Sequence, residues 1–285
     1  MRLLTWAAVL AAAFVAFSLL SFWLAVRPPR LHIPGTPADH RLRAEDVRIP
    51  VGDGVILSGW LAPRPGAPAV LLLHGYPANK ADLLPLAASL SPDFGVLLID
   101  HRYFGQGDGA RVTTLGHRER GDTRRALDLL AARGHERIGV FGFSMGGAVA
   151  LMAAAEDSRV RAVAAYAPFA DLRALAADLY GWLGPLRRPF VGLLVGWSQL
   201  LLGADITRPT PVSAARALEI PVLLIASRDD DQIPFRHAED LREALRGNPA
   251  AELLVMEGGG HGGLPPAVRA RMLAFFREHL SSPRD

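Results

Sequence analysis

The residues Gly142-Phe143-Ser144-Met145-Gly146-Gly147 decide how the rest of the chain is interpreted. An apolar run, Arg137–Phe141, precedes them, and a second one, Ala148–Ala155, follows. This order predicts a strand, a sharp turn and a helix. Gly-x-Ser-x-Gly in that setting is typical of a nucleophile elbow, a strained turn that holds a serine hydroxyl above the carboxyl end of a sheet. The two flanking glycines are expected to let the strand and the helix approach closely.

Two further side chains suit chemistry at this serine. Ser144 needs a base, because a serine hydroxyl is a poor nucleophile unaided. His261 is the best candidate, since it lies in a glycine-rich loop directly after the last predicted strand. An acid must orient the imidazole, and Asp229, Asp230 and Asp231 follow the strand before it. The serine, the acid and the histidine thus each follow a predicted strand, at the edge where open α/β sheets form their sites.

Apolar runs alternate with predicted helices along most of the chain. The other expected buried strands are Ala69–Leu73, Gly95–Asp100, Val160–Tyr166, Pro221–Ser227 and Ala251–Met256. Helices are expected over Ala81–Leu90, Arg118–Arg133, Arg236–Leu245 and Ala267–Leu280. Near the start, Val47–Val51 and Val55–Leu61 flank Asp53-Gly54 and predict a hairpin, in which Pro50 indicates an edge strand. This alternation predicts an α/β fold with a mostly parallel, doubly wound sheet.

The segment 168–218 interrupts the alternation. Glycines and prolines break it into short pieces, so we expect a helical cap insertion over the carboxyl edge of the sheet. Within it, Phe190–Leu202 carries no charge and is too short to cross a bilayer. Two interpretations of this run stay open: a cap helix that faces the core, and a lipophilic substrate tunnel or membrane-dipping lid.

The amino-terminal segment is apolar enough to enter a membrane. Leu3–Val26 contains no charged residue and is long enough to cross a bilayer as a helix. Trp6 and Trp23 lie near its ends, as interfacial anchors do. A cleaved signal peptide usually has a shorter apolar region and a small-x-small cleavage site, and no clear site precedes Arg27. We expect one transmembrane helix, with a signal peptide and a buried soluble helix as alternatives.

These segments give a simple domain organisation. We expect an anchor over residues 1–27, a proline-rich linker over 28–46 and one α/β domain over 47–285. The arginines that follow the anchor favour a domain on the inner side of the membrane, but long domains translocate regardless of flanking charge. The side of the membrane therefore stays open, as does the oligomeric state.

The composition argues against several classes of site. The net charge of the 285 residues is only +3, and the arginines are scattered, so a nucleic-acid partner gains little support. The chain has no cysteine, which removes disulfides, thiolate catalysis and cysteine metal sites. We expect no metal and no organic cofactor, since a serine, a base and an acid suffice for acyl chemistry.

The chain resembles serine hydrolases of the α/β-hydrolase superfamily. It is most similar to the branch of serine aminopeptidase-like, monoglyceride-lipase-like and Bem46-like proteins. The resemblance covers roughly Val47–Leu280, and its landmarks are His74-Gly75, the elbow around Ser144, Asp230-x-x-Ile233-Pro234 and Gly260-His261. It implies an α/β-hydrolase fold whose cap insertion shapes the substrate pocket.

The resemblance also implies roles for individual residues. Its spacing favours Asp230 over its two neighbours as the acid. The backbone N–H of Met145, at the start of the helix, can face an oxyanion, and the family supplies a second donor at the position of Tyr76. In this chain Tyr103-Phe104 stand where the family has a single glycine, so the pocket is expected to differ in shape.

Other polar residues receive simpler interpretations. His74 is expected to be a structural histidine of the oxyanion turn, and Asp100 a structural residue at a strand end. The remaining histidines considered are expected to be surface or loop residues: His101, His117, His135 and His237.

Together these observations predict a membrane-anchored serine hydrolase. We expect it to cleave a carboxylic ester or thioester of a small, lipid-like acyl substrate through an acyl-enzyme on Ser144. A peptidase is one alternative, with Asp171 and Asp178 in the cap as candidates for binding a peptide amino terminus. An acyltransferase and a non-catalytic scaffold on the same fold are the others.

Overall fold

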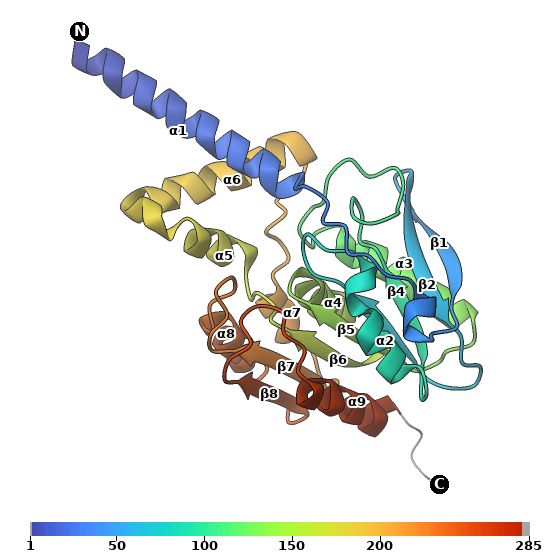
Figure 1. The fold of residues 1–285 in the computed structure, drawn as a ribbon. Helices are drawn as coiled ribbons and strands as arrows, with labels where there is room; N and C mark the ends of the chain where they lie inside the picture. The colour runs from blue at the N-terminus through green and yellow to red at the C-terminus, as the bar shows by residue number, and fades with distance from the viewer. Residues whose placement is uncertain (1, 281–285) are drawn as a thin grey trace.

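A single sheet organises the protein. The computed structural model describes residues 2–280; residue 1 of the expected anchor and residues 281–285 of the expected α/β domain lie outside the described residues. Within the described part, eight strands lie in the order β1-β2-β4-β3-β5-β6-β7-β8 (Figure 1). Their bounds are Glu45–Gly52, Val55–Ala62, Ala69–Leu73, Gly95–Ile99, Ile138–Phe143, Val160–Tyr166, Val222–Ser227 and Ala251–Met256, for β1 to β8 in turn.

The strand pairing confirms the predicted α/β architecture. β1 and β2 form an antiparallel hairpin, and β2 pairs antiparallel with β4. Every pair from β4 across to β8 is parallel. Pro50 lies in β1 at the edge of the sheet, where a missing N–H costs no ladder hydrogen bond.

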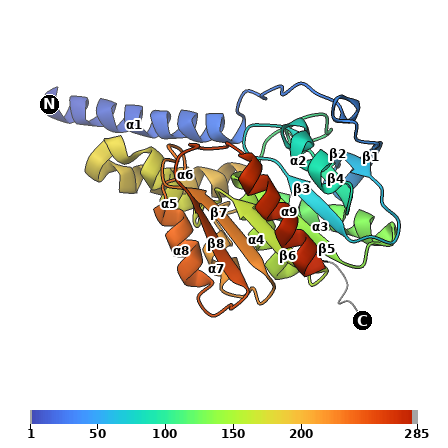
Figure 2. The ribbon, with the colours of Figure 1, turned by 60° about the horizontal axis from the view of Figure 1, so that its bottom comes forward.

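Helices cover both faces of this sheet. One face packs against α2 (Leu84–Leu90) and α9 (Pro266–Leu280), and the other packs against α3 (Glu119–Ala132), α4 (Met145–Glu156), α7 (Pro211–Ala215) and α8 (Arg236–Ala244) (Figure 2). Alternate residues of each central strand face opposite sides of the sheet. In β3, Val70 and Leu72 belong to the apolar cluster beneath α2 and α9, and Leu71 and Leu73 belong to the cluster on the other face. Burial on both faces explains the continuous apolar runs in the sequence.

The insertion predicted after β6 is helical. It contains α5 (Leu172–Leu179), a 3-10 helix (Gly181–Leu186) and α6 (Arg187–Leu202). The chain then returns to the sheet, because α7 packs against α4 and α8. The cap therefore consists of α5, the 3-10 helix and α6.

The amino-terminal segment is one continuous helix, α1 (Arg2–Val26), which is long and apolar enough to cross a membrane. Residues 2–13 are exposed, whereas the carboxyl-terminal half lies along α6 (Figure 1). The ring of Phe190 packs on those of Phe14 and Phe17, with centroid distances of 5.4 and 5.2 Å. The indole N–H of Trp197 donates to the hydroxyl of Ser18 at 2.9 Å. The uncharged run in α6 therefore packs against α1.

The segment between α1 and β1 lies against the α/β domain. The backbone N–H of Leu31 donates to the carbonyl of Pro77 at 3.3 Å. The side-chain amide of Asn79 donates to the carbonyl of Ile33 at 3.2 Å. These bonds hold the linker on the loop that follows β3.

Candidate active site

Ser144 occupies a strained turn between β5 and α4. Its φ of 53° and ψ of −117° are unusual for a residue with a side chain. A Cβ atom on Gly142 would lie 2.1 Å from the carbonyl oxygen of Gly146, and one on Gly146 would lie 2.3 Å from that of Leu73. Only glycine fits at these two positions, so the close approach predicted for the elbow is present. The backbone N–H of Ser144 donates to Tyr166 at 2.8 Å and ties the turn to β6.

The structure brings together the three side chains that the sequence singled out. Nε2 of His261 lies 3.0 Å from Oγ of Ser144, and Nδ1 of His261 lies 2.7 Å from Oδ2 of Asp230. The His261 and Asp230 side chains are only 6% and 3% exposed. With the proton of the neutral imidazole on Nδ1, His261 donates to the carboxylate and accepts the serine hydroxyl proton at Nε2.

Asp230 is held by three donors. Its Oδ1 accepts hydrogen bonds from the backbone N–H groups of Gln232 and Ile233 at 2.9 and 2.8 Å. Burial alone would raise the pKa of Asp230, but these bonds and the one from His261 hold it below its usual range. The neighbouring Asp229 and Asp231 are exposed. Of the three adjacent aspartates, Asp230 is therefore the one that contacts the histidine.

Two aromatic residues support the loop that carries His261. The ring of Phe143 packs on the imidazole with a centroid distance of 5.0 Å. The phenol of Tyr166 donates to the carbonyl of Gly263 at 2.7 Å. Sequence reasoning missed both residues, although Phe143 lies inside the elbow motif and Tyr166 ends a predicted strand.

The turn after β3 lies beside the serine. A Cβ atom on Gly75 would lie 3.2 Å from Cβ of Ser144. Nδ1 of His74 donates to the carbonyl of Gly75 at 2.7 Å, and Nε2 accepts the backbone N–H of His101 at 3.0 Å. Burial lowers the pKa of His74, which keeps the ring neutral for this pattern. His74 thus braces the turn that carries the backbone of Tyr76, as a structural histidine would.

Aromatic residues connect this turn to α1. The phenol of Tyr76 donates to the carbonyl of Ala25 in the last turn of α1 at 3.1 Å, and burial raises the pKa of Tyr76 to about 12. The phenol of Tyr103 donates to the carbonyl of Pro28 at 2.8 Å. Phe104 is buried and packs edge-on against Tyr76 with a centroid distance of 5.8 Å. Tyr103 and Phe104, which stand where the family has a single glycine, therefore contact both the turn after β3 and the linker.

A buried ion pair supports the loop after β4. Nζ of Lys80 lies 2.6 Å from Oδ2 of Asp100, and both side chains are almost fully buried. Lys80 also donates to the Ser58 hydroxyl at 3.1 Å, and Oδ1 of Asp100 accepts the backbone N–H of Lys80 at 2.8 Å. These contacts agree with the structural role expected for Asp100.

The prediction that the remaining histidines lie on the surface or in loops was wrong for His237. It lies in α8 and is fully buried, because its ring joins α8 to the cap. Nδ1 accepts the backbone N–H of Ala170 at 3.2 Å, and Nε2 lies 3.1 Å from Asp178. His101 follows the end of β4, and His135 follows the end of α3. Both are also buried, which their positions in loops do not reveal.

The cap carboxylates considered for a peptide amino terminus have other partners. Oδ1 of Asp171 caps α5 by accepting the backbone N–H groups of Arg173 and Ala174 at 2.7 and 3.0 Å. Asp178 pairs with Arg236 as well as with His237. Both therefore stabilise the cap.

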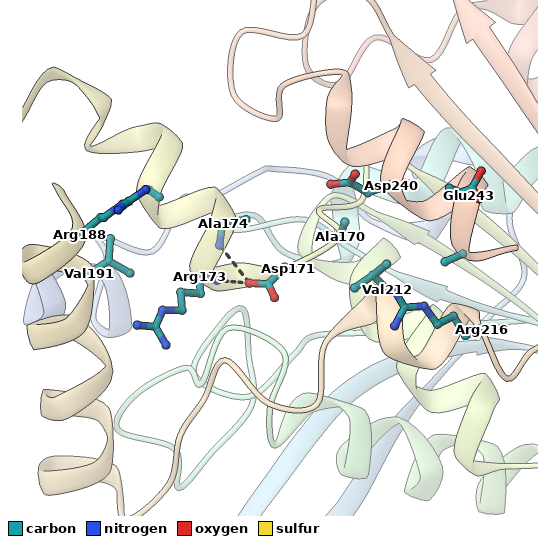
Figure 3. Close-up of a pocket in the computed structure, with 12 residues that line it drawn as sticks. Ala170, Asp171, Arg173, Ala174, Arg188, Val191, Val212, Arg216, Asp240 and Glu243 are labelled. Atoms are coloured by element: carbon teal, nitrogen blue, oxygen red, sulfur yellow. Dashed lines mark hydrogen bonds between the residues drawn. The ribbon is translucent and has the colours of Figure 1, made fainter. Parts of the chain in front are cut away.

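One cleft of the structure has walls that do not include Ser144. A cleft of about 830 Å³ separates the cap from α7 and α8, and Figure 3 shows its charged side chains on both walls. They are Asp171, Arg173, Arg188, Arg216, Asp240 and Glu243, so positive and negative charges balance. Among the described residues, no group of three His, Asp or Glu side chains could hold a metal ion.

Comparison with known proteins shows the family to which the fold belongs. Residues 68–190 match the model of the α/β-hydrolase fold family, and residues 197–283 match that of TAP-like proteins. The chain is 31% identical to the uncharacterised protein YqkD of Bacillus subtilis, over 75% of this chain and 71% of the relative. The chain belongs to the α/β-hydrolase superfamily. This confirms the resemblance found in its motifs.

Two further relatives of this α/β hydrolase carry names that describe an activity. It is 34% identical to polyketide transferase af380 of Aspergillus fumigatus, over 84% of this chain and 99% of the relative. Its structure is similar to that of the esterase Pf2001 of Pyrococcus furiosus, with a TM-score of 0.73 and 25% identity. That comparison covers 90% of this chain and all of the esterase.

Proposed function

We propose that this α/β hydrolase is a membrane-anchored serine hydrolase that cleaves a carboxylic ester or thioester of an acyl, lipid-like substrate. The observation that carries the proposal is the hydrogen-bonded series Ser144–His261–Asp230, with distances of 3.0 and 2.7 Å. A nucleophile, a base and an orienting carboxylate in this arrangement are what acyl transfer from an ester needs. The similarity to an esterase supports the choice of substrate class.

In the first half of the reaction, Ser144 acts as the nucleophile. Its Oγ attacks the substrate carbonyl carbon while its proton passes to Nε2 of His261. Asp230 accepts the hydrogen bond from Nδ1 and stabilises the imidazolium. The backbone N–H groups of Tyr76 and Met145 receive the oxyanion, and one such donor contributes about 3–4 kcal/mol to lowering the barrier. The proton then passes from His261 to the leaving alcohol or thiol, and the acyl group stays on Ser144.

In the second half, water takes the place of the leaving group. His261 removes a proton from water, whose oxygen attacks the acyl-enzyme, and the same proton returns to Oγ of Ser144 as the acid departs. The helix α1 is the proposed membrane anchor, which would hold this site near a lipid surface.

The substitution Ser144→Ala tests this function. We expect the purified full chain to hydrolyse p-nitrophenyl hexanoate and the variant to lose that activity, because the substitution removes the proposed nucleophile. Equal turnover by the two proteins would refute the proposal.

An acyltransferase is the second candidate, and the similarity to a polyketide transferase over 99% of that relative's length favours it specifically. In that case an alcohol replaces water in the second half of the reaction. Product analysis with an added alcohol distinguishes the two: a new ester that outpaces the free acid supports transfer, and free acid alone supports hydrolysis.

A further inference from the structure

The end of helix α1 lies against the turn that carries a proposed oxyanion donor. The last carbonyls of any helix lack partners within the helix, so they need donors from elsewhere. In α1, the carbonyl of Ala25 accepts the phenol proton of Tyr76 at 3.1 Å, and the carbonyl of Val26 accepts the backbone N–H of Thr113 at 3.0 Å. The side chain of Tyr76 thus joins α1 to the turn after β3.

Tyr76 therefore links α1 to the site through its own backbone. Its backbone N–H is the proposed donor to the oxyanion, and its phenol holds the helix. The turn lies beside the nucleophile, since a Cβ atom on Gly75 would lie 3.2 Å from Cβ of Ser144. Only two side-chain torsions separate the phenol ring from the backbone of a tyrosine. A displacement of Ala25 would therefore be passed on to the donor N–H.

Packing restricts these two torsions. The ring of Tyr76 packs edge-on against Phe104, which is buried, with a centroid distance of 5.8 Å. Tyr76 and Phe104 belong to the same apolar cluster as Met145, whose backbone N–H is the other proposed oxyanion donor. Close packing leaves such side chains in defined rotamers. The side chains of both donor residues are thus held in one cluster.

The acceptor for Tyr76 is held in place by further contacts. Near the end of α1, Phe22 is only 3% exposed and Val26 is fully buried, and both pack in one apolar cluster with Ile206. In the linker that follows, the carbonyl of Pro28 accepts the phenol proton of Tyr103 at 2.8 Å. The end of α1 therefore gives Tyr76 a fixed acceptor.

We propose that the hydrogen bond from Tyr76 to Ala25 is a positioning contact for the oxyanion hole, through which the proposed membrane anchor supports catalysis. The inference rests on the proposed function, because it needs the N–H of Tyr76 as an oxyanion donor. Such a donor is effective only when it is aimed at the position that the oxyanion occupies. The docked helix holds the donor there, and loosening α1 leaves the triad in place but stabilises the transition state less.

The test removes the phenol hydroxyl alone, in the full chain in lipid nanodiscs. Tyr76→Phe keeps the ring and the backbone N–H but loses the bond to Ala25. Loss of a whole oxyanion donor lowers kcat by about 10²–10³, and a displaced donor keeps part of this effect. We expect kcat for p-nitrophenyl hexanoate to fall about tenfold, or about 1.4 kcal/mol, with KM unchanged, because the contact acts on the transition state.

A transition-state analogue gives a second readout. A trifluoromethyl ketone forms a tetrahedral adduct on a serine nucleophile, and the oxygen anion of the adduct occupies the oxyanion hole. Its affinity for Tyr76→Phe is expected to fall by the same factor as kcat, because transition-state analogues report the same contacts. A loss of stability alone would not change kcat and inhibitor affinity together at constant KM.

Tyr103→Phe is the matched control. It removes a phenol that donates to Pro28 of the same segment, but the backbone of Tyr103 is not a proposed oxyanion donor, so kcat should stay at the wild-type value. Phe22→Ala loosens α1 itself. It is expected to lower kcat in the wild-type background and to add no further loss in the Tyr76→Phe background, since both changes act through one contact.

The outcomes separate this contact from the proposed function. Wild-type kcat and inhibitor affinity in Tyr76→Phe, an equal loss in Tyr103→Phe, or additive losses with Phe22→Ala would overturn the positioning contact alone. Both tyrosine variants keep their rings, so their comparison decides the matter even if Phe22→Ala fails to fold. A wild type that neither hydrolyses the ester nor reacts with a fluorophosphonate would instead overturn the proposed function.

Discussion

Replacing Asp230 by asparagine tests how the proposed triad is oriented. Oδ1 of Asp230 accepts two backbone N–H groups, from Gln232 and Ile233. In Asp230→Asn the amide oxygen has to take this place, because an NH₂ group there would face two donors. The NH₂ group then points at Nδ1 of His261 and donates to it. The imidazole is forced to carry its proton on Nε2, where it cannot accept the proton of Ser144.

The expected loss is large because the wrong tautomer blocks the first step. In a serine hydrolase triad the same change lowers kcat by about 10⁴, which corresponds to about 5 kcal/mol. Steady-state hydrolysis of p-nitrophenyl hexanoate by the purified full chain measures it. The controls are Asp229→Asn and Asp231→Asn, which alter exposed neighbours and should keep wild-type activity. A loss of activity below tenfold in Asp230→Asn would refute the assignment of Asp230 as the orienting acid. A loss above tenfold in either control would refute it as well.

Three further predictions concern the framework of the site. Lys80→Met should lower the free energy of unfolding by about 3–5 kcal/mol in denaturant titrations, because Asp100 stays buried without its cation; an unchanged midpoint would contradict this. Gly146→Ala should abolish fluorophosphonate labelling, since its Cβ would lie 2.3 Å from a backbone oxygen, whereas Gly121→Ala, with open space around the new Cβ, should label normally. Burial holds the pKa of His101 well below 6.5, so its contribution to stability is present above pH 6.5 and is lost as the pH falls towards its folded value. The unfolding free energy of His101→Leu should therefore fall less steeply than that of the wild type as the pH is lowered. An unaltered slope of unfolding free energy against pH would count against a buried, neutral His101.

Much of the active-site framework could be predicted from local sequence patterns. The central strands are chiefly apolar because both sheet faces are covered, and Ser144, Asp230 and His261 lie in the turn or loop after β5, β7 and β8. Gly142 and Gly146 flank Ser144 because a Cβ at either position would meet a backbone oxygen. Each constraint leaves a local mark in the sequence, either an apolar run or a glycine at a fixed distance from Ser144, so a single sequence records it.

Contacts between distant segments could not be predicted in the same way. Helix α1 is apolar on all sides, so its composition does not reveal that one face packs on Phe190 of the cap. Tyr76 donates a hydrogen bond to the end of α1, and Tyr103 donates one to the linker. In both cases the donor and the acceptor lie far apart in the sequence. The burial of His237 likewise depends on contacts with Ala170 and with Asp178 of α5, which lie far from it in the sequence. Such contacts depend on the arrangement of the whole chain rather than on any local pattern.

The most direct test of the proposed mechanism is to identify the residue that a fluorophosphonate modifies. The full-length protein is incubated with the probe, digested and analysed by peptide mass spectrometry. The 3.0 Å contact between Ser144 and His261 predicts a single adduct on Ser144, which disappears in Ser144→Ala and in His261→Ala. An unlabelled wild-type protein, or an adduct on another residue, would contradict the account.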